Sequence, residues 1–353
     1  MSSSIITGVK IAGLASAVPE QMRTLADDIL VYGAEEVVKI SDSTGVKRRH
    51  VAPPNICTSD LCFAASEQLM AAASIARDSI DCLIFVSQTP DYRLPATSCI
   101  LQSRLGLSNT CAAFDVSMGC SGYVYGLWIA STLIASGGAK RVLLLVGDTS
   151  NKLVAPRDRS VSLLFGDAGT ATLLERSEQS ASVTFVLGTD GAGQNNLIVP
   201  AGGFRTPASD ATGMRSEREN GNIRSEEDLY MNGAEIFSFT LSRVAPLIKT
   251  VLENSGWSSQ DVDNYVFHQA NKFMLNHLAK KMKLPSEKVV LALENYGNTS
   301  SASIPLAMTT SLAEKLRVGE LKLVLAGFGV GYSWGAAALT IGPIVLPELV
   351  IVK

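Results

Sequence analysis

A cysteine, a histidine and an asparagine each lie where a strand-like run or a turn feeds a helical segment. Cys120 lies between the strand-like run 112–116 and an apolar segment from 122 to 136. His268 follows a second apolar run, and Asn298 lies in a polar turn ahead of a helix. A thiol, an imidazole and an amide donor are the parts of an activated-nucleophile site. If the fold brings the three together, they predict nucleophilic catalysis.

Taken singly, each of these residues has an ordinary structural explanation. Free cysteines are among the most buried residues, a lone histidine is more often a satisfied core residue, and a polar turn often only caps a helix. The glycine-rich stretch 328–335 adds backbone N–H groups that could hold an oxyanion, although such a loop alone is weak support. The four features together favour a catalytic interpretation.

The segment after Cys120 is apolar nearly all the way round, which predicts a helix buried in the core of a large domain. A helix N-terminus carries partial positive charge, which favours thiolate over thiol. Gly119 and Gly122 permit a tight turn and the close approach of a substrate. We therefore expect Cys120 to be a buried thiolate.

Composition narrows the function classes. The chain has 353 residues, is 46% hydrophobic and 18% charged, and carries a formal net charge of −3. This charge argues against nucleic acid or an anionic membrane as the main partner. The six cysteines form no Cys-x-x-Cys pair and, with only three histidines, predict reduced thiols and no metal site. No signal peptide or membrane span is apparent, so we expect a cytoplasmic protein.

Strands that are apolar on both faces alternate with helical patterns, which predicts an α/β fold with helices on both faces of a sheet. We expect strands at 8–14, 82–86, 112–116 and 141–146, and helices at 25–39, 58–76, 96–105 and 122–136, with a loop at 41–45. The segment 188–230 lacks sustained periodicity, and such a long loop in a compact protein is usually functional or an excursion between the two halves. A helix follows at 233–255, and Pro246 predicts a kink or a break within it.

The chain also repeats itself weakly. The run 81–86 is echoed by 263–267, the run 141–147 by 322–327, and the run 166–171 by 334–338. Chance similarity between apolar strands is an alternative, but the order and spacing agree. The pattern favours two α/β repeats that share one core.

Nearly the whole chain resembles the β-ketoacyl-acyl carrier protein synthase III family of the thiolase fold. The resemblance rests on the stretches 44–50, 115–123, 159–167, 268–271, 297–300 and 328–335. It implies a five-layer αβαβα sandwich of two similar halves, usually a homodimer. The first half, 1–178, would carry the cysteine, and the second, 179–353, the histidine and the asparagine.

The resemblance also implies a mechanism that needs no resident cofactor. Cys120 would be acylated by an acyl-coenzyme A (or an acyl carrier protein) and would condense that group with malonyl-acyl carrier protein, with loss of carbon dioxide. His268 and Asn298 would donate hydrogen bonds to the enolate, and the backbone N–H groups of Cys120 and Val330 would form the oxyanion hole. Asn suits this role because an amide has two N–H donors and a carboxylate has none.

Further residues take roles by the same resemblance. Arg159 and Asn271 would contact coenzyme A or its pantetheine arm, and Leu94 stands where the family usually has a phenylalanine facing the partner's acyl pocket. Lys39 and Ser43 replace a tryptophan and an arginine that hold the nucleotide, and Val330 replaces a glycine. Lys272, Lys280 and Lys281 would dock the acidic carrier protein, although charge alone predicts only a solvated helix face.

Two other functions stay open at this level. One is an acyltransferase of the same fold that moves the acyl group from Cys120 to a hydroxyl or amine. The other is a catalytically silent subunit, against which the joint presence of Cys120, His268 and Asn298 argues. Release of carbon dioxide from malonyl-carrier protein separates the first alternative from a condensing enzyme.

Overall fold

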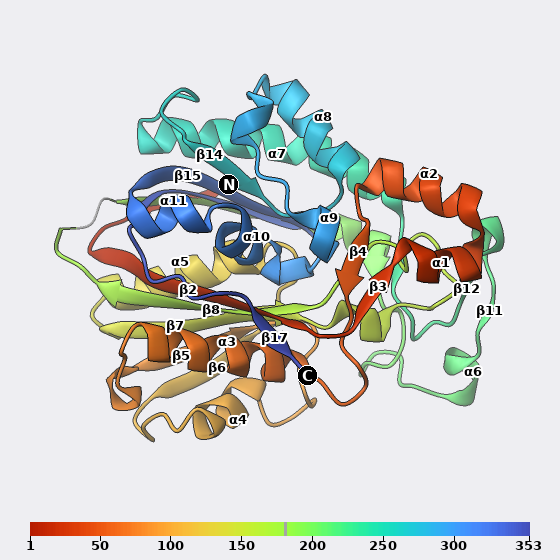
Figure 1. Ribbon diagram of the computed structural model, residues 1–353, viewed down its shortest axis with the longest axis horizontal. Coiled ribbons are helices and arrows are strands. Elements are labelled where there is room, and N and C mark those ends of the chain that lie inside the picture. Colours follow the sequence, from red (N-terminus) through yellow and green to blue (C-terminus); the bar gives the residue numbers. More distant parts are fainter. Residues whose placement is uncertain (180–181) are drawn as a thin grey trace.

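Five layers stack from top to bottom in the view of Figure 1. The structure is a computed structural model that describes residues 1–179 and 182–353. The outer helical layers are α7 (Gly233–Ser255) with α8 (Lys272–Met282), and α3 (Thr58–Ala72) with α4 (Thr97–Arg104). The central layer holds α5 (Gly122–Ala135) and α10 (Ser303–Ser311). Two sheets separate these layers, which is the expected five-layer αβαβα arrangement.

The first sheet has the order β17-β2-β8-β7-β5-β6 and the second the order β1-β9-β16-β15-β14. The strands of the first are β17 (Val350–Val352), β2 (Val9–Pro19), β8 (Ala168–Arg176), β7 (Arg141–Asp148), β5 (Cys82–Val86) and β6 (Ala112–Val116). Those of the second are β1 (Ser2–Ile6), β9 (Val183–Thr189), β16 (Ser333–Ile341), β15 (Leu321–Gly329) and β14 (Asn264–Phe267).

The topology confirms the internal repeat. In the first sheet β5 pairs parallel with β7, and β7 pairs antiparallel with β8. In the second, β14 pairs parallel with β15, and β15 pairs antiparallel with β16. The chain passes from one sheet to the other between β8 and β9, while the terminal strands β1 and β17 each join the sheet of the other half. The division of the chain at residue 178 stays a prediction.

Parallel pairing fixes where the functional residues lie. Because β5, β6 and β7 run parallel, their carboxyl ends lie side by side at one end of the strands. Asp148 is the last residue of β7, and Cys120 follows β6 at this same end. In the second sheet β14 and β15 end at His268 and Gly329 for the same reason. The backbone N–H of His268 also donates to the Ala326 carbonyl (2.8 Å), which holds His268 in line with its strand.

The N-terminal region differs from the sequence prediction. Instead of one helix at 25–39 there are two, α1 (Leu25–Tyr32) and α2 (Ala34–Thr44), and α2 includes the predicted loop at 41–45 except for its last residue. The break falls at Gly33, whose φ of +80° suits glycine and interrupts the helical path. Strands β3 (Met22–Thr24) and β4 (Arg48–His50) flank this region, where Arg49 forms a buried ion pair with Asp28 (2.7 Å).

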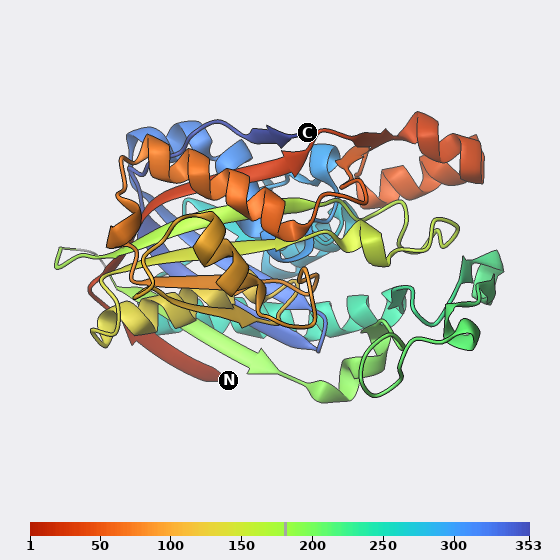
Figure 2. The ribbon, with the colours of Figure 1, turned by 90° about the horizontal axis from the view of Figure 1, so that it is seen from below.

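The 188–230 excursion is not structureless, as Figure 2 shows at the same end of the molecule as α1 and α2. It contains η3 (Gly191–Asn196), β10 (Leu197–Ile198), α6 (Asp210–Gly213), β11 (Ser216–Glu217), η4 (Glu219–Gly221), β12 (Ile223–Arg224) and β13 (Tyr230–Met231). The predicted break at Pro246 does not occur, because α7 continues as one helix through it. The remaining elements are η1 (Arg77–Ser79), η2 (Ser150–Leu153), η5 (Ser286–Lys288), α9 (Leu293–Tyr296), η6 (Ser300–Ala302) and α11 (Ala313–Val318).

One strand is less buried than its apolar sequence indicates. β6 lies at an edge of the six-stranded sheet, and its side chains are partly accessible. Within residues 1–179 and 182–353, no helix combines the length and apolar composition that crossing a bilayer requires.

Candidate active site

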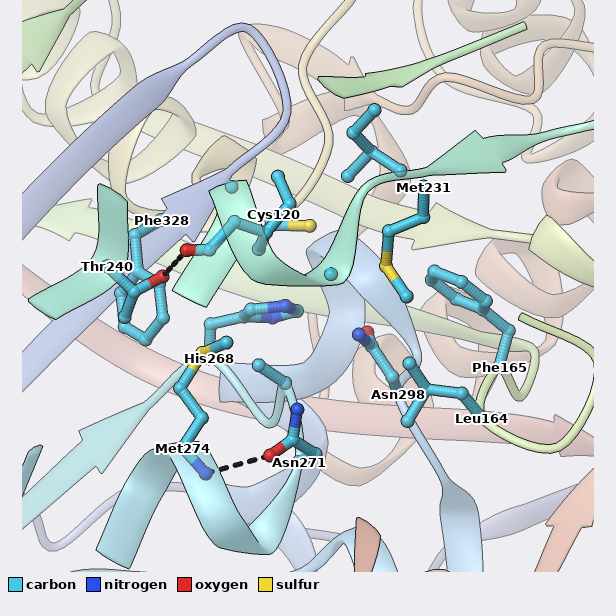
Figure 3. A pocket seen from close by; sticks show the side chains of 15 residues that line it. Cys120, Leu164, Phe165, Met231, Thr240, His268, Asn271, Met274, Asn298 and Phe328 are labelled. Atoms are coloured by element: carbon cyan, nitrogen blue, oxygen red, sulfur yellow. Dashed lines mark hydrogen bonds between the residues drawn. The ribbon is translucent and has the colours of Figure 1, made fainter. Parts of the chain in front are cut away.

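A cavity of about 490 Å³ brings Cys120, His268 and Asn298 together (Figure 3). The three side chains reach it from the turn before α5, from the residue after β14 and from the turn before η6. Asn271 also lines it. The rest of the wall is mainly apolar: Leu164, Phe165, Leu197, Met231, Ile236, Ala270, Met274, Phe328 and Gly329, with Gly233 and Thr240. An apolar channel with a few converging polar groups is the usual form of a small-molecule site.

Cys120 lies immediately before Ser121, the N-cap of α5, and is only 6% exposed. Burial raises the pKa of the Cys120 thiol to about 11 and outweighs hydrogen bonds that favour the thiolate. The raised pKa runs against the predicted resting thiolate, because burial penalises the charged form. Gly329 is required beside it, since a Cβ there would lie 2.8 Å from Cys120 Sγ.

The backbone around Val330 faces the sulfur. Hydrogen bonds from the backbone of Val330 and of Cys120 oppose the rise of the thiol pKa, so both groups lie against Sγ. The Val330 carbonyl accepts a hydrogen bond from the Ser333 hydroxyl (2.9 Å), which in turn contacts Ser121 Oγ (2.6 Å). These are the two backbone groups that the sequence predicts for an oxyanion hole.

His268 is 2% exposed, and burial lowers its pKa to about 4. Its Nδ1 lies 2.7 Å from the Ser303 hydroxyl, a hydrogen bond to the Ser300 backbone partly offsets the effect of burial on its pKa, and the ring lines the cavity. A hydroxyl can either donate to Nδ1 or accept from it, so the neutral ring can present a bare Nε2 or an Nε2–H. His268 is thus suited to accept a proton at one stage and to donate a hydrogen bond at another.

The amide of Asn298 has a fixed orientation. Its Oδ1 accepts the Ser300 N–H (2.9 Å), which leaves the Nδ2 donors free for the cavity, where Figure 3 shows the amide. The Asn298 backbone N–H donates to the Leu164 carbonyl (2.9 Å). Gly297 permits this close pairing, because its φ is +66° and a Cβ would lie 2.6 Å from the Leu164 oxygen.

A second cavity, of about 400 Å³, adjoins Cys120. Cys120, Phe165 and Leu197 line both cavities, so the sulfur lies between them. The other residues of the second cavity are Gln88, Thr89, Asp148, Ser150, Leu153, Leu229, Ser300 and Val330. The sulfur is therefore accessible from two sides, which suits a nucleophile that must meet an incoming thioester and then carry its acyl group.

Two predicted contact residues lie outside both cavities. Arg159 ties α2 to the excursion through an ion pair with Glu36 (3.4 Å) and a hydrogen bond to the Asn220 carbonyl (2.7 Å). Leu94 is 79% exposed and does not line either cavity of its own chain. Any role of Leu94 in an acyl pocket therefore requires a second copy of the chain.

Asn271 and the three predicted docking lysines belong to α8. Asn271 caps this helix by accepting the Met274 N–H (2.8 Å) while it lines the cavity. Lys272, Lys280 and Lys281 are exposed on the helix that starts at the cavity, although the Lys281 ammonium donates to the Leu241 carbonyl (2.6 Å). Lys272 therefore lies at the end of α8 that starts at the cavity, and Lys280 and Lys281 lie in its last turn.

Sequence reasoning missed the residues that hold the three central side chains. Ser303 orients the imidazole, Ser300 orients the amide, and Asp148 lies in the wall of the second cavity. The sequence does contain one signal for Asp148, because Asp148 is a charged residue at the end of an apolar strand. The two serines lie in a turn that the sequence marks only as polar.

A cysteine, a histidine and an asparagine that meet between two sheets of a five-layer sandwich are the arrangement of the thiolase-fold acyl-transferring enzymes. Comparison with known proteins narrows this class. Residues 114–191 match the family model described as 3-oxoacyl-(acyl-carrier-protein) synthase III, and residues 252–341 match its C-terminal counterpart.

Individual relatives cover almost the whole chain. A beta-ketoacyl-(acyl-carrier-protein) synthase III of Symbiobacterium thermophilum is 38% identical over 340 residues, which is 96% of this chain and 99% of the relative. The crystal structure of a 3-oxoacyl-(acyl-carrier protein) synthase from Burkholderia xenovorans has a TM-score of 0.94 and 47% identity, covering 99% of each chain. The synthase III of Pseudomonas aeruginosa has a TM-score of 0.83 and 31% identity, covering 97% of this chain and 100% of that one. The chain belongs to the 3-oxoacyl-(acyl-carrier-protein) synthase III family.

Proposed function

We propose that this protein condenses an acyl group carried on Cys120 with malonyl-acyl carrier protein, releasing carbon dioxide and giving 3-oxoacyl-acyl carrier protein. The observation that carries the proposal is the single cavity that holds Cys120, His268 and Asn298 beside the backbone N–H of Val330. Thiol, imidazole, amide and backbone donors supply the whole reaction, so no resident cofactor is needed.

In the first half-reaction Cys120 must lose its proton. With a raised thiol pKa and a neutral imidazole nearby, the proton passes from Sγ to Nε2 of His268. The sulfur bonds to the acyl carbon, the bond to the sulfur of coenzyme A or of a carrier breaks, and the departing thiolate takes the proton back. The Cys120 and Val330 N–H groups hold the oxyanion.

In the second half-reaction malonyl-carrier protein occupies the same channel. Its terminal carboxylate leaves as carbon dioxide, and the electron pair forms an enolate on the thioester. Nε2–H of His268 and Nδ2–H of Asn298 donate to the enolate oxygen. The enolate carbon then bonds to the acyl carbon, the ketone forms, and the Cys120 sulfur leaves as a thiolate that takes up one proton from solvent to restore the thiol.

Purified protein incubated with an acyl-coenzyme A and carboxyl-labelled malonyl-carrier protein tests this function. We expect labelled carbon dioxide and 3-oxoacyl-carrier protein in equal amounts. Transfer of the acyl group to a hydroxyl or amine without carbon dioxide would instead support the acyltransferase alternative. Absence of any adduct on Cys120 would leave only a catalytically silent role.

The α8 lysines support an acidic carrier protein as the partner. Reversing Lys280 and Lys281 to glutamate should raise the KM for malonyl-carrier protein by about 10-fold, because complementary charges guide and orient such complexes. The KM for acyl-coenzyme A should stay within about twofold. Lys315→Glu, on an exposed position of α11, is the matched control. An equal effect on both substrates would contradict the docking role.

A homodimer is the proposed assembly, and the exposed apolar surface supports it. The open edge strand β6 and the adjoining face of α5 carry accessible apolar side chains, which a second copy would cover: Phe114, Val116, Trp128, Ile129 and Leu133. Such a protein, with acyl-coenzyme A and a carrier protein as partners, would work in the cytoplasm.

Leu94→Phe tests whether the partner shapes the acyl pocket. A larger side chain reaching the partner's pocket should lower kcat/KM for an octanoyl primer relative to an acetyl primer by about 10-fold. Acetyl, octanoyl and branched primers are compared under the same conditions. Val318→Phe, at an equally exposed site on α11, should leave the profile unchanged. Identical profiles for Leu94→Phe and the parent would reject the role of Leu94.

A further inference from the structure

Asp148 is a buried carboxylate next to the site that the proposed reaction does not use. It ends β7, is 1% exposed and lines the second cavity with Cys120. The groups that hydrogen-bond to it are neutral hydroxyls and backbone N–H groups. A buried charge is costly unless it is well hydrogen-bonded. A carboxylate that is held by this many hydrogen bonds beside the site suggests a structural or functional role.

Each carboxylate oxygen of Asp148 serves one half of the molecule. Oδ1 accepts the Gln88 N–H (2.8 Å) and the Ser87 hydroxyl (3.1 Å), which follow β5 of the first sheet. Oδ2 accepts the hydroxyl (2.6 Å) and the N–H (3.2 Å) of Ser301, which lies in the turn after Asn298. The carboxylate thus joins the two halves where their strand ends meet.

The turn that Asp148 holds is the one that presents the Asn298 amide. Ser300 has a φ of +49°, a left-handed conformation that is unfavourable for a residue with a side chain. Its N–H fixes the Asn298 amide, and its hydroxyl interacts with both the Cys120 thiol and the Asp148 carboxylate. Such a backbone conformation persists only when its surroundings hold it, and Asp148 bonds to the next residue, Ser301.

We propose that Asp148 is a positioning residue, whose carboxylate clamps the 298–301 turn to the first half and so sets the Asn298 donor for condensation. The proposal rests on the proposed function. Asp148 touches no reacting atom and acts through Ser300 and Ser301. It is the one residue described above that bonds to both the β5 end and the Asn298 turn.

The same carboxylate also acts on the thiol through its charge. Its negative charge raises the pKa of Cys120, in addition to the larger effect of burial. Its charge also raises the pKa values of Asp167 and Cys62. Burial raises the pKa of the Asp148 carboxyl itself, and the hydrogen bonds from Ser301, Gln88 and Ser300 oppose that rise by stabilising the ionised form. Removing the charge should therefore loosen the turn but ease ionisation of Cys120.

Asp148→Asn separates these two effects. The amide has one accepting oxygen, so it cannot satisfy both Gln88 N–H and Ser301 N–H. We expect kcat for condensation to fall by about 10²-fold with KM within about threefold, since a displaced donor costs rate more than binding. We expect the midpoint of the pH profile for Cys120 alkylation by iodoacetamide to move to lower pH.

Two further variants make the result decisive. Ser301→Ala removes one bond of the clamp and keeps the charge, so kcat should fall by about 10-fold with no shift of the alkylation midpoint. Asp115→Asn changes a carboxylate that bonds to the Thr97 and Ser98 N–H groups, away from the Asn298 turn, and should keep both readouts near those of the parent. Thermal unfolding of each variant checks its fold.

Each outcome bears on the proposal. A normal kcat in Asp148→Asn would overturn it. An unshifted alkylation midpoint would refute only the effect of the Asp148 charge on Cys120, and the kcat of Ser301→Ala then decides the clamp. If Asp148→Asn does not fold, Ser301→Ala decides through its kcat. If the parent protein itself does not condense, the proposed function fails, while the alkylation profile still reports on Asp148 and Cys120.

Discussion

Replacing Cys120 by alanine is expected to abolish the acyl-enzyme and to lower kcat for 3-oxoacyl product by at least about 10⁴-fold. The sulfur is the only atom at the junction of the two cavities that can carry the acyl group between the half-reactions. Intact-protein mass spectrometry after incubation with acyl-coenzyme A measures the adduct, and a product assay measures the turnover.

The same variant should separate decarboxylation from condensation. Cys120→Ala keeps the His268 ring and the Asn298 amide, which are the donors that stabilise the enolate. Malonyl-carrier protein should therefore still release carbon dioxide, while no 3-oxoacyl product appears. The ratio of carbon dioxide to product should rise from about one in the parent to a large value.

Cys99→Ala is the control for adventitious acylation, because Cys99 is an exposed free thiol. We expect this variant to retain both the adduct and the turnover of the parent. An adduct on Cys120→Ala that disappears in Cys99→Ala, or condensation that survives without Cys120, would contradict the proposed mechanism.

Local sequence patterns predicted the elements that carry the site. The strand at 112–116 has the predicted bounds, and the helix at 233–255 matches its pattern despite Pro246. These segments are long or strongly patterned, so local periodicity decides them. The repeat also predicted which strands correspond, since β14, β15 and β16 copy the pairing of β5, β7 and β8.

Other features depend on contacts that a local pattern does not contain. The helix expected at 25–39 is divided at Gly33, and its residues are anchored by the distant Arg49 through Asp28. The 188–230 excursion gains short strands by pairing with itself, as β11 does with β12. The apolar sequence of β6 predicts a buried strand, but β6 lies at the edge of its sheet. The order of strands in a sheet depends on the path of the whole chain and not on the composition of one strand.

The sequence predicts the three central residues of the candidate site, but it does not predict the residues that hold them in position. Cys120, His268 and Asn298 each follow a recognisable sequence signal, and the structure places them in one cavity. The prediction of a resting thiolate did not allow for burial, which the sequence alone does not measure and which raises the pKa of the Cys120 thiol. Ser303 and Asp148 act on residues 35 and 153 positions away, so only the fold reveals them.

Asn298→Asp is expected to lower kcat for condensation by about 10³-fold or more while leaving acylation of Cys120 nearly unchanged. Loss of one preorganised donor to an oxyanion costs about 10²–10³-fold. An ionised carboxylate adds repulsion of the enolate within a buried, poorly solvated channel. Asn298→Ala, which removes the donor without adding charge, should therefore be the less damaged of the two variants.

Single-turnover measurements locate the defect. The rate of adduct formation on Cys120 should be close to that of the parent, and the rate of its discharge by malonyl-carrier protein should be lowered. Asn295→Asp makes the same chemical change three residues away, where the side chain bonds to Arg48 (3.0 Å) outside the cavity, and should be nearly silent. If Asn298→Asp slows both half-reactions equally, the amide serves the fold of the turn, because only a donor to the enolate can affect the second half-reaction alone.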